Sequence, residues 1–478
     1  MQAIQTKGLD IDLIMSNAKK AATEFREYGQ LRTDAVVKAV YQAVFDKRVH
    51  LAKMAHEETG IGKWKDKVQK NIIASRFVYE DIKDQKTCCV ISESIFMTEI
   101  AQPIGPIFCI TPITNPTSTA IFKILIALKT RNPIIIRPHG AARKCTIETA
   151  QICYDAAIAA GAPENCIQWV KRSTPEETMR MMSHKRVALN LATGSVSLVR
   201  AAYKSGNPTI GVGPGNVPVY IGKSSDVKFA VDQIILSKTF DNGTICASEQ
   251  AVIVSTNNSK KVIAEFKRRN AYFLNKEEIK KVAKIAFNKE QKTMAATVIG
   301  QSAHYIAKLA GIDVPEDTSL LMAPMEKHEV GLDHPLSLEI LAPILAFYEV
   351  DSFKDGIEMC KKINVLGGLG HTVSIFSKYE EKIKEFATVM NAGRILVNQP
   401  SSQGALGGTY NTLQPSLTLA CGSGGKNITT DNISVQHLMN IQRVARRKVN
   451  DCLECTHLQH CDEIITASSI EKICTKKF

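Results

Sequence analysis

The chain has 478 residues, of which 44% are hydrophobic and 22% are charged. This is the composition of a globular protein, and the length exceeds the roughly 250–300 residues at which a single core stops growing, so two or more domains are expected. No run of about 18 apolar residues is present, so the sequence predicts no membrane-spanning helix.

The thirteen cysteines are odd in number and scattered along the chain. This usage predicts reduced thiols in a cytoplasmic setting rather than a disulfide framework. Residues 1–25 carry acidic side chains within their apolar part and no basic-then-apolar leader, so secretion is not expected.

The formal net charge of +13 raises the question of nucleic-acid binding. The basic residues are spread along the whole chain, however, and the densest segment, 259–287, has the pattern of amphipathic helices with solvated lysines. No zinc-finger or RNA-recognition signature accompanies it. A polyanionic small ligand or a plain solvated surface is therefore the expectation, and nucleic acid is not the expected partner.

Residues 10–82 predict helices, because apolar residues recur there at three- and four-residue spacing. Residues 91–103 have the pattern of one arm of a β-hairpin. From about residue 104, short apolar runs such as "PIIIRP" (133–138) alternate with helical segments, and a second set of alternations runs from Cys246 to about 425. This alternation is typical of repeated βαβ units, so the expected fold is α/β with mostly parallel sheets.

The stretch "DNGTICASEQ" (241–250) places Cys246 in a small, polar bend just before an apolar, strand-like run. A thiol attacks other groups only as the thiolate, so it needs nearby backbone donors or positive charge and some access to solvent. The turn-forming Asn-Gly pair and the small neighbours favour a nucleophile with room for a substrate. The alternative is a buried structural cysteine, which is the more common role of this residue type.

In "TPITNPTSTAIFK" (111–123), Pro116 follows Asn115 in the order of a helix cap and a first turn. The preceding apolar run predicts a strand, which places Asn115 at a carboxyl edge, where open α/β sheets bind ligands. Its side-chain amide could donate to an oxyanion formed on a substrate carbonyl. The alternative is a simple helix cap.

A strand ending at Ala192 and a helix beginning after Ser195 predict a turn whose free backbone amides could accept a phosphate. The segment "GVGPGN" (211–216) resembles a dinucleotide fingerprint only superficially, and it more readily shapes a tight turn.

Taken together, these stretches resemble the coenzyme A-dependent, acylating aldehyde dehydrogenases, including the aldehyde dehydrogenase half of bifunctional aldehyde-alcohol dehydrogenases. The resemblance covers about residues 10–447. It is carried, in the order of the family, by "TPITNPTSTAIFKILIALKTRN", "GAPENCIQWV", "AAYKSGNPTIGVGPGNVPV", "KTFDNGTICASEQ", "GLGHT", "RILVNQPSSQGALGGTYN" and "PSLTLACGSGGKN".

The resemblance implies that the Cys246 thiolate attacks the aldehyde, that Asn115 and the Cys246 backbone N–H hold the oxyanion, and that hydride passes to NAD or NADP. His371 in "GLGHT" is implied either as a base for an incoming thiol or as a contact near the acyl group, with a structural histidine as the alternative. The cofactor contacts implied are Thr111, Pro112, Arg137, His139, Gly194, Ser195, Gly211, Gly213 and Glu339.

Hydrolytic aldehyde dehydrogenases carry a glutamate base where this chain has Gly211. Without that base, water is poorly activated, and the thiol of coenzyme A becomes the expected acceptor of the acyl group. The predicted reaction is reversible, because one thioester is exchanged for another. A hydrolytic dehydrogenase, an acyl-phosphate reductase and a catalytically silent scaffold protein are the rival hypotheses.

Ser401, Ser402 and Gln403 are expected to line the aldehyde end of the pocket. Small and polar side chains there favour a short substrate such as acetaldehyde, although the same hydroxyls could hold the anionic end of succinate semialdehyde or sulfoacetaldehyde. Arg137 could recognise the 2′-phosphate of NADP bidentately, or it could be a surface arginine that never meets the cofactor.

The resemblance implies a Rossmann-like cofactor-binding domain (1–86 and 104–238), an α/β catalytic domain (239–425) and an oligomerisation element (87–103 and 426–447) that builds homodimers or larger assemblies. Residues 448–478 differ in composition from the rest of the chain and are expected to be an appended tail. They hold a cluster that could bind zinc and a possible amphipathic helix of the kind that packages related enzymes in bacterial microcompartments. The cluster consists of Cys452, Cys455, His457, His460 and Cys461.

Overall fold

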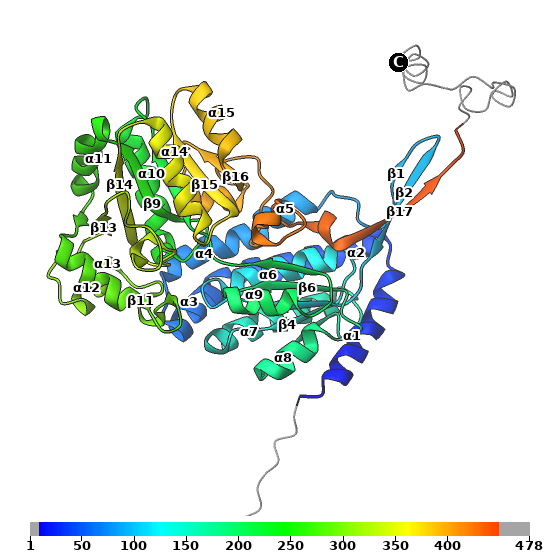
Figure 1. Cartoon of the computed structure of the whole chain (residues 1–478). Coiled ribbons are helices and arrows are strands. Elements are labelled where there is room, and N and C mark those ends of the chain that lie inside the picture. The colour runs from blue at the N-terminus through cyan, green and yellow to red at the C-terminus, as the bar shows by residue number, and fades with distance from the viewer. Residues whose placement is uncertain (1–8, 449–478) are drawn as a thin grey trace, which may run out of the picture.

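The computed structural model of the protein describes residues 9–448. Its N-terminal part is helical, as the apolar spacing predicts, and a π-helical turn, Ile73–Phe77, joins the last two helices. These helices pack beside the first of two parallel sheets (Figure 1). They are α1 (Ile11–Arg26), α2 (Gln30–Asp46), α3 (Arg48–Thr59), α4 (Trp64–Ile72) and α5 (Val78–Ile82).

The first parallel sheet has five strands in the order β5-β4-β3-β6-β7. Its strands carry apolar side chains on both faces, as expected of a sheet covered by helices on both sides. Ile107 and Cys109 of β3 face a core shared with α2, α6 and α7, whereas Phe108 and Ile110 face α1, α8 and α9. The strands are β3 (Ile107–Ile110), β4 (Ile134–Arg137), β5 (Ile167–Trp169), β6 (Leu189–Thr193) and β7 (Thr209–Val212), and the helices are α6 (Pro116–Lys129), α7 (Arg143–Ala159), α8 (Pro175–Met182) and α9 (Val196–Tyr203).

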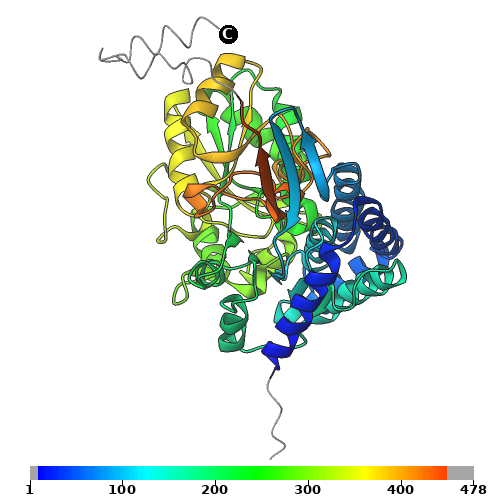
Figure 2. The ribbon, with the colours of Figure 1, turned by 90° about the vertical axis from the view of Figure 1, so that its right-hand side faces the viewer.

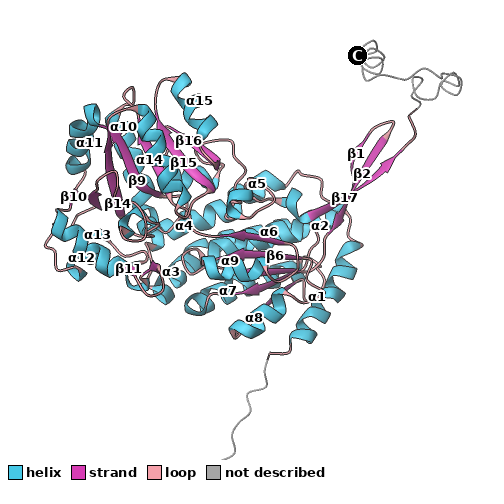
Figure 3. Ribbon diagram, in the orientation of Figure 1, coloured by secondary structure: helices cyan, strands magenta, loops and turns pink. Residues whose placement is uncertain are grey.

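The second parallel sheet has seven strands in the order β10-β13-β14-β9-β8-β15-β16, with helices on both faces (Figure 3). Side chains alternate along each strand: Val252 and Val254 of β9 pack toward α10 and α11, and Ile253 packs toward α14 and α15. The strands are β8 (Val217–Ile221), β9 (Glu249–Ser255), β10 (Ala271–Phe273), β13 (Leu320–Pro324), β14 (Ile344–Val350), β15 (Gly370–Phe376) and β16 (Ala392–Val397). The helices are α10 (Val227–Thr239), α11 (Thr256–Arg268), α14 (Phe353–Val365) and α15 (Glu380–Val389).

The chain passes from the first sheet to the second between β7 and β8, over residues 213–216. The division expected from sequence assigned residues up to 238 to the cofactor-binding domain, yet β8 is a strand of the seven-stranded sheet and α10 packs on that sheet. The sequence pattern of β8 and α10 continues the same βαβ rhythm, so it carries no mark of the change of sheet.

A three-stranded antiparallel sheet, β1-β2-β17, projects from the body of the molecule (Figures 1 and 2). Its strands are β1 (Cys89–Glu93), β2 (Met97–Pro103) and β17 (Met439–Ala445). The expectation of a single hairpin arm over 91–103 was wrong in extent, because this segment holds most of a complete hairpin that turns at 94–96. The third strand comes from a segment more than three hundred positions later and pairs with β2.

Smaller elements complete the second half of the chain. They are α12 (Lys276–Ala286), α13 (Ala303–Leu309), α16 (Ser401–Leu406) and a two-stranded ribbon of β11 (Phe287–Asn288) and β12 (Thr293–Met294). None of the helices between residues 9 and 448 combines the length and the apolar character needed to cross a membrane.

Candidate active site

Cys246 lies in a turn between a 3-10 helix, Phe240–Gly243, and the start of β9. Three successive residues of that segment have positive φ angles: 48° at Asp241, 54° at Asn242 and 75° at Gly243. Left-handed backbone is unfavourable for residues with a Cβ, so the conformation must be held by the surrounding structure.

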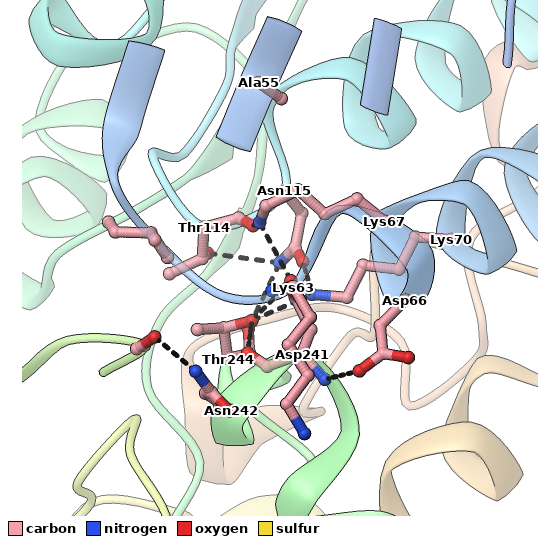
Figure 4. A network of polar contacts seen from close by, with 12 residues as sticks. Ala55, Lys63, Asp66, Lys67, Lys70, Thr114, Asn115, Asp241, Asn242 and Thr244 are labelled. Atoms are coloured by element: carbon pink, nitrogen blue, oxygen red, sulfur yellow. Dashed lines mark hydrogen bonds and ion pairs between the residues drawn. The ribbon is translucent and has the colours of Figure 1, made fainter. Parts of the chain in front are cut away.

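The hydrogen bonds of the Asp241 carboxylate hold this segment in its left-handed conformation (Figure 4). The carboxylate accepts hydrogen bonds from the Lys63 backbone N–H (2.6 Å), the Lys67 ammonium (2.9 Å), the Lys70 ammonium and the Thr244 hydroxyl (2.8 Å). The Asp241 carboxylate is fully buried, and the two lysine side chains are 3% and 2% exposed. Burial alone would raise the pKa of Asp241, but Lys70 and Lys67 hold it below its ordinary value.

Lys70 also donates to Oδ1 of Asn115 at 2.6 Å. An ammonium has no lone pair, so only the carbonyl oxygen of the amide can face it. The Asn115 amide nitrogen is therefore turned away from Lys70, toward the Thr114 hydroxyl at 3.1 Å and the Thr244 carbonyl at 3.5 Å. Thr244 stands two residues before Cys246, so this orientation aims the amide N–H groups at the segment that holds the thiol.

The sequence left two roles open for Asn115, a helix cap and a donor to a substrate oxygen. Asn115 does occupy the cap position of α6, with Pro116 in the first turn, but its side chain makes no capping hydrogen bond. The side chain is instead held across the site by a buried cation. This arrangement fits a donor to a substrate oxygen better than it fits a helix cap.

Nε2 of His371 lies 3.2 Å from Sγ of Cys246. The sequence pattern placed His371 in a glycine-rich loop, but it is the second residue of β15 and is fully buried. Burial, with the nearby cation of Arg394, holds the pKa of His371 well below its ordinary value, so the ring is neutral. Burial also raises the pKa of Cys246 to about 12, with Glu339 acting in the same direction, so the resting group is a thiol.

Gly215 packs between these groups. A Cβ at this position would lie 2.3 Å from the Cys246 carbonyl oxygen and 3.2 Å from the His371 ring, so only glycine fits. Its backbone N–H donates to Oε1 of Glu339 at 2.8 Å. Burial raises the pKa of Glu339 to about 8. The sequence indicated Glu339 and gave no sign of its partner.

The carboxyl edge of the first sheet holds groups suited to a nicotinamide cofactor. Thr111, just after β3, has a buried hydroxyl with no hydrogen-bond partner among the described residues. The fully buried ammonium of Lys123 donates to the Ile110 carbonyl (3.1 Å), the Leu191 carbonyl (2.9 Å) and the Thr193 hydroxyl (3.0 Å). Lys123, which sequence reasoning missed, therefore ties together the ends of β3 and β6.

The other residues indicated for the cofactor also lie at this edge. Arg137 ends β4, donates to the Ser173 hydroxyl at 3.3 Å and is partly buried. His139 caps a short 3-10 turn through Ala141 N–H at 3.2 Å, and burial lowers its pKa. Gly194 and Ser195 precede α9 as expected, while Pro112, partly accessible, follows Thr111.

Gly211 lies in β7 and has no space for a side chain. A Cβ there would lie 2.7 Å from Val199 and 3.2 Å from the Tyr203 ring. Its carbonyl accepts hydrogen bonds from the Tyr203 hydroxyl (3.1 Å) and the Asn427 amide (3.0 Å). Gly213, the next glycine, follows the end of β7 and is partly accessible.

Ser401, Ser402 and Gln403 form the first half of α16 and are all buried. The Ser402 hydroxyl contacts the Ser237 hydroxyl of α10 at 3.0 Å and Gln403 at 2.5 Å, so both side chains already have partners. The Ser401 hydroxyl is buried without a partner among the described residues.

The five metal-ligand candidates of the tail, Cys452, Cys455, His457, His460 and Cys461, lie outside the described residues, as does the possible helix over 462–478. Among residues 9–448, no three His, Cys, Asp or Glu side chains are grouped in a way that could hold a metal ion.

The chain is similar to known proteins in sequence. The chain matches the model of the aldehyde dehydrogenase family over residues 2–411. It is 45% identical to the aldehyde-alcohol dehydrogenase of Clostridium acetobutylicum, over 92% of this chain and 51% of that protein. It is also 36% identical to the succinate-semialdehyde dehydrogenase (acetylating) of Clostridium kluyveri, over 91% of this chain and 95% of that protein.

The chain is also similar to solved structures. An acetylating aldehyde dehydrogenase from Geobacillus thermoglucosidasius superposes with a TM-score of 0.89 at 46% identity, covering 92% of this chain and 97% of that one. A propionaldehyde dehydrogenase from a fucose utilisation bacterial microcompartment of Clostridium phytofermentans gives a TM-score of 0.83 at 26% identity, covering 91% and 97%. The chain belongs to the aldehyde dehydrogenase family, and acetylating enzymes are among its relatives. It spans about half the length of the aldehyde-alcohol dehydrogenases that it matches.

The Asp241 carboxylate should dominate the stability of the site. Asp241→Asn leaves two buried ammonium groups without a counter-charge, and we expect a loss of about 3–5 kcal/mol in the free energy of unfolding. Glu80→Gln, which removes the partner of Lys83 in an exposed ion pair, is the matched control and should change stability little. Urea denaturation measures both, and equal losses in the two variants would show that the buried network carries no special stability.

Proposed function

We propose that this chain oxidises a short-chain aldehyde to an acyl-coenzyme A, with NAD or NADP as hydride acceptor, and that the reaction is reversible. The observation that carries the proposal is the grouping of Cys246, His371 and an Asn115 amide whose orientation is fixed by Lys70. The family relationship supports the same chemistry, since acetylating aldehyde dehydrogenases are among the relatives.

In the proposed mechanism, the Cys246 thiol passes its proton to solvent water and its sulfur forms a bond to the aldehyde carbon, while the carbonyl electron pair moves to the oxygen. The Asn115 amide and the Cys246 backbone N–H donate to that oxygen. NAD or NADP, when bound at the carboxyl edge of the first sheet, would supply the hydride acceptor for oxidation of this adduct to an acyl thioester on Cys246. Thr111, Gly194, Ser195 and Glu339 are the residues we assign to holding the cofactor.

The crowding around Gly211 supports coenzyme A over water as the acyl acceptor. No carboxylate can occupy this position while Val199 and Tyr203 stand against it. The position of the glutamate base of hydrolytic enzymes is therefore closed, and a thiol is the stronger nucleophile toward the thioester. The attacking sulfur replaces the Cys246 sulfur, which leaves as a thiolate and recovers a proton.

Acetaldehyde is the substrate we favour. The Ser402 and Gln403 side chains are paired with each other and with α10, which leaves Ser401 as the one residue of this set with an unpartnered hydroxyl. Succinate semialdehyde remains the second candidate, because a relative that this chain matches over almost its whole length carries that name.

The central test is nicotinamide reduction with acetaldehyde, with coenzyme A present or omitted. We expect sustained turnover only with coenzyme A, and none with Cys246→Ala. Cys360→Ala, which changes a buried thiol of α14 in the second sheet's core, is the matched control and should keep its activity. Sustained turnover without coenzyme A would mean that water reaches the acyl-enzyme and would overturn the inference from Gly211.

Cofactor choice is proposed to depend on Arg137. This residue ends β4, and Nε of its guanidinium donates to the Ser173 hydroxyl. Running the assay with NAD and NADP in parallel on Arg137→Ser measures its contribution. We expect NADP use to fall about tenfold or more and NAD use to change little, because a guanidinium binds the 2′-phosphate bidentately. Equal effects on both cofactors would rule the role out.

A homodimer is proposed to form through the β1-β2-β17 sheet. Strand β1 is exposed along most of its length, and Ile95 and Phe96 at the hairpin turn are 81% and 44% exposed. Three strands without a covering layer lack a core of their own, and a second copy would provide one. Phe96→Asp should therefore lower the molar mass measured by light scattering, whereas an unchanged mass would show that another surface joins the copies.

Packaging in a bacterial microcompartment is a further proposal and rests on the microcompartment relative from Clostridium phytofermentans. Co-purification with shell proteins, compared with and without residues 462–478, tests it, and retention that is unaffected by the deletion would refute a targeting role for that segment.

A further inference from the structure

A chain of side-chain contacts leads from the active-site thiol into the second sheet. His371 and Thr372 belong to β15, and Arg394 of β16 lies directly beside Thr372 in the parallel register. Nε2 of His371 contacts the Cys246 sulfur at 3.2 Å, and Nδ1 contacts the Thr372 hydroxyl at 2.9 Å. The same hydroxyl accepts a hydrogen bond from Nε of Arg394 at 3.2 Å.

The direction of these hydrogen bonds follows from the chemistry of the groups. A guanidinium can only donate, so it occupies a lone pair of the Thr372 oxygen. The single proton of that hydroxyl then has one acceptor within reach among the described residues, which is Nδ1 of His371. A neutral imidazole that accepts at Nδ1 carries its proton at Nε2. The ring therefore presents an N–H to the sulfur.

The surroundings of Arg394 keep its guanidinium in place, so Arg394 remains the donor to the Thr372 hydroxyl. It is 2% exposed, and its position is set by carbonyl groups from three segments that surround it. Its two terminal nitrogens donate to the carbonyls of His371 (2.8 Å), Ala420 (2.7 Å) and Thr430 (3.1 Å) and to Oδ1 of Asn432 (3.3 Å).

We propose that Arg394 and Thr372 are positioning residues that fix His371 as the Nε2–H tautomer, so that His371 donates a hydrogen bond to Cys246 and does not remove its proton. Only the catalytic consequence of this inference rests on the proposed function, because the tautomer exists whether or not the enzyme turns over. A donor at this place stabilises the thiolate when it forms and again when it leaves the acyl group.

The charged and titratable groups around the sulfur give this donor its importance. Burial and Glu339 both oppose the thiolate, and Cys421 acts in the same direction. Arg394 is the cation that favours it, but it donates to the Thr372 hydroxyl and the His371 carbonyl and has no hydrogen bond to the Cys246 sulfur among the described residues. The Nε2–H of His371 is thus the neutral side-chain donor in contact with the sulfur, and the Cys246 backbone N–H acts in the same direction.

Nitrogen-15 NMR of the full chain labelled at histidine tests the tautomer directly. The signals of His371 are assigned by their loss in His371→Gln. We expect Nε2 to resonate as a protonated nitrogen and Nδ1 as an unprotonated one in the wild type. The opposite pattern would overturn the proposal without any bearing on whether the protein oxidises aldehydes.

The pH dependence of Cys246 alkylation by iodoacetamide tests the role of the hydroxyl. Thr372→Val keeps the β-branched shape but removes the proton that Nδ1 accepts, so the ring is free to take the Nδ1–H form. We expect the alkylation rate at a fixed pH below the thiol pKa to fall about tenfold or more, because a hydrogen bond to a charged sulfur is lost. Thr372→Ser retains the hydroxyl and should restore the wild-type profile.

Ser374→Ala supplies the structural control, since it removes another buried hydroxyl from the same strand, one that donates to the Leu396 carbonyl at 3.3 Å. Its alkylation profile should match that of the wild type. If Thr372→Val leaves the profile unchanged, or if Ser374→Ala shifts it equally, Thr372 has no specific effect on the thiol and the proposal fails. Activity with coenzyme A, measured on the same samples, reports separately on the proposed function.

Discussion

The pairing of one buried carboxylate with two buried ammonium groups is the constraint on which the rest of the site depends. Asp241 is separated from Lys67 and Lys70 by more than 170 positions, so its ion pairs join the N-terminal helices to the loop that carries Cys246, the proposed nucleophile. Burying such charges is costly, and the cost is offset only when each has well-placed partners. The same contacts hold residues 241–243 in left-handed backbone and so fix the start of the turn that carries Cys246.

The site gathers at the point where the chain changes sheets. The residues that we assign to the cofactor come mostly from the carboxyl edge of the five-stranded sheet, whereas His371 and Arg394 come from the seven-stranded one. The crossing segment 213–216 lies between them, and its glycine at 215 lets the backbone of one sheet approach the nucleophile of the other. Open parallel sheets bind ligands at their carboxyl edges, and here the carboxyl edge of the five-stranded sheet meets the amino ends of β9, β15 and β16.

Sequence reasoning identified the parts of this site whose signal is local. Cys246 stands in a distinctive turn before a strand, Asn115 precedes a proline at a helix start, and the alternation of apolar runs and helical segments indicated the parallel α/β fold. The family resemblance supplied Glu339 and His371.

The residues that sequence reasoning missed act over long range. Lys67 and Lys70 sit on an amphipathic helix whose lysines have the sequence pattern of a solvated face, and Arg394 is one basic residue among sixty in a basic chain. Nothing in their neighbourhoods distinguishes a buried cation from an exposed one, because the partners that bury them lie far away in the chain. The change of sheet before β8 was missed for a related reason, since the apolar strand pattern is the same in both sheets.

The shared ammonium of Lys70 sets a limit on how this protein can evolve. Buried ion pairs can often be exchanged for apolar residues of similar size at little or no loss of stability. Here such an exchange would release Oδ1 of Asn115, and the amide could then rotate to present its oxygen to the developing oxyanion. Selection for heat resistance alone could therefore drift toward an apolar helix face at α4, while selection for turnover would keep the lysine. A library of variants screened under the two pressures would diverge at this position first.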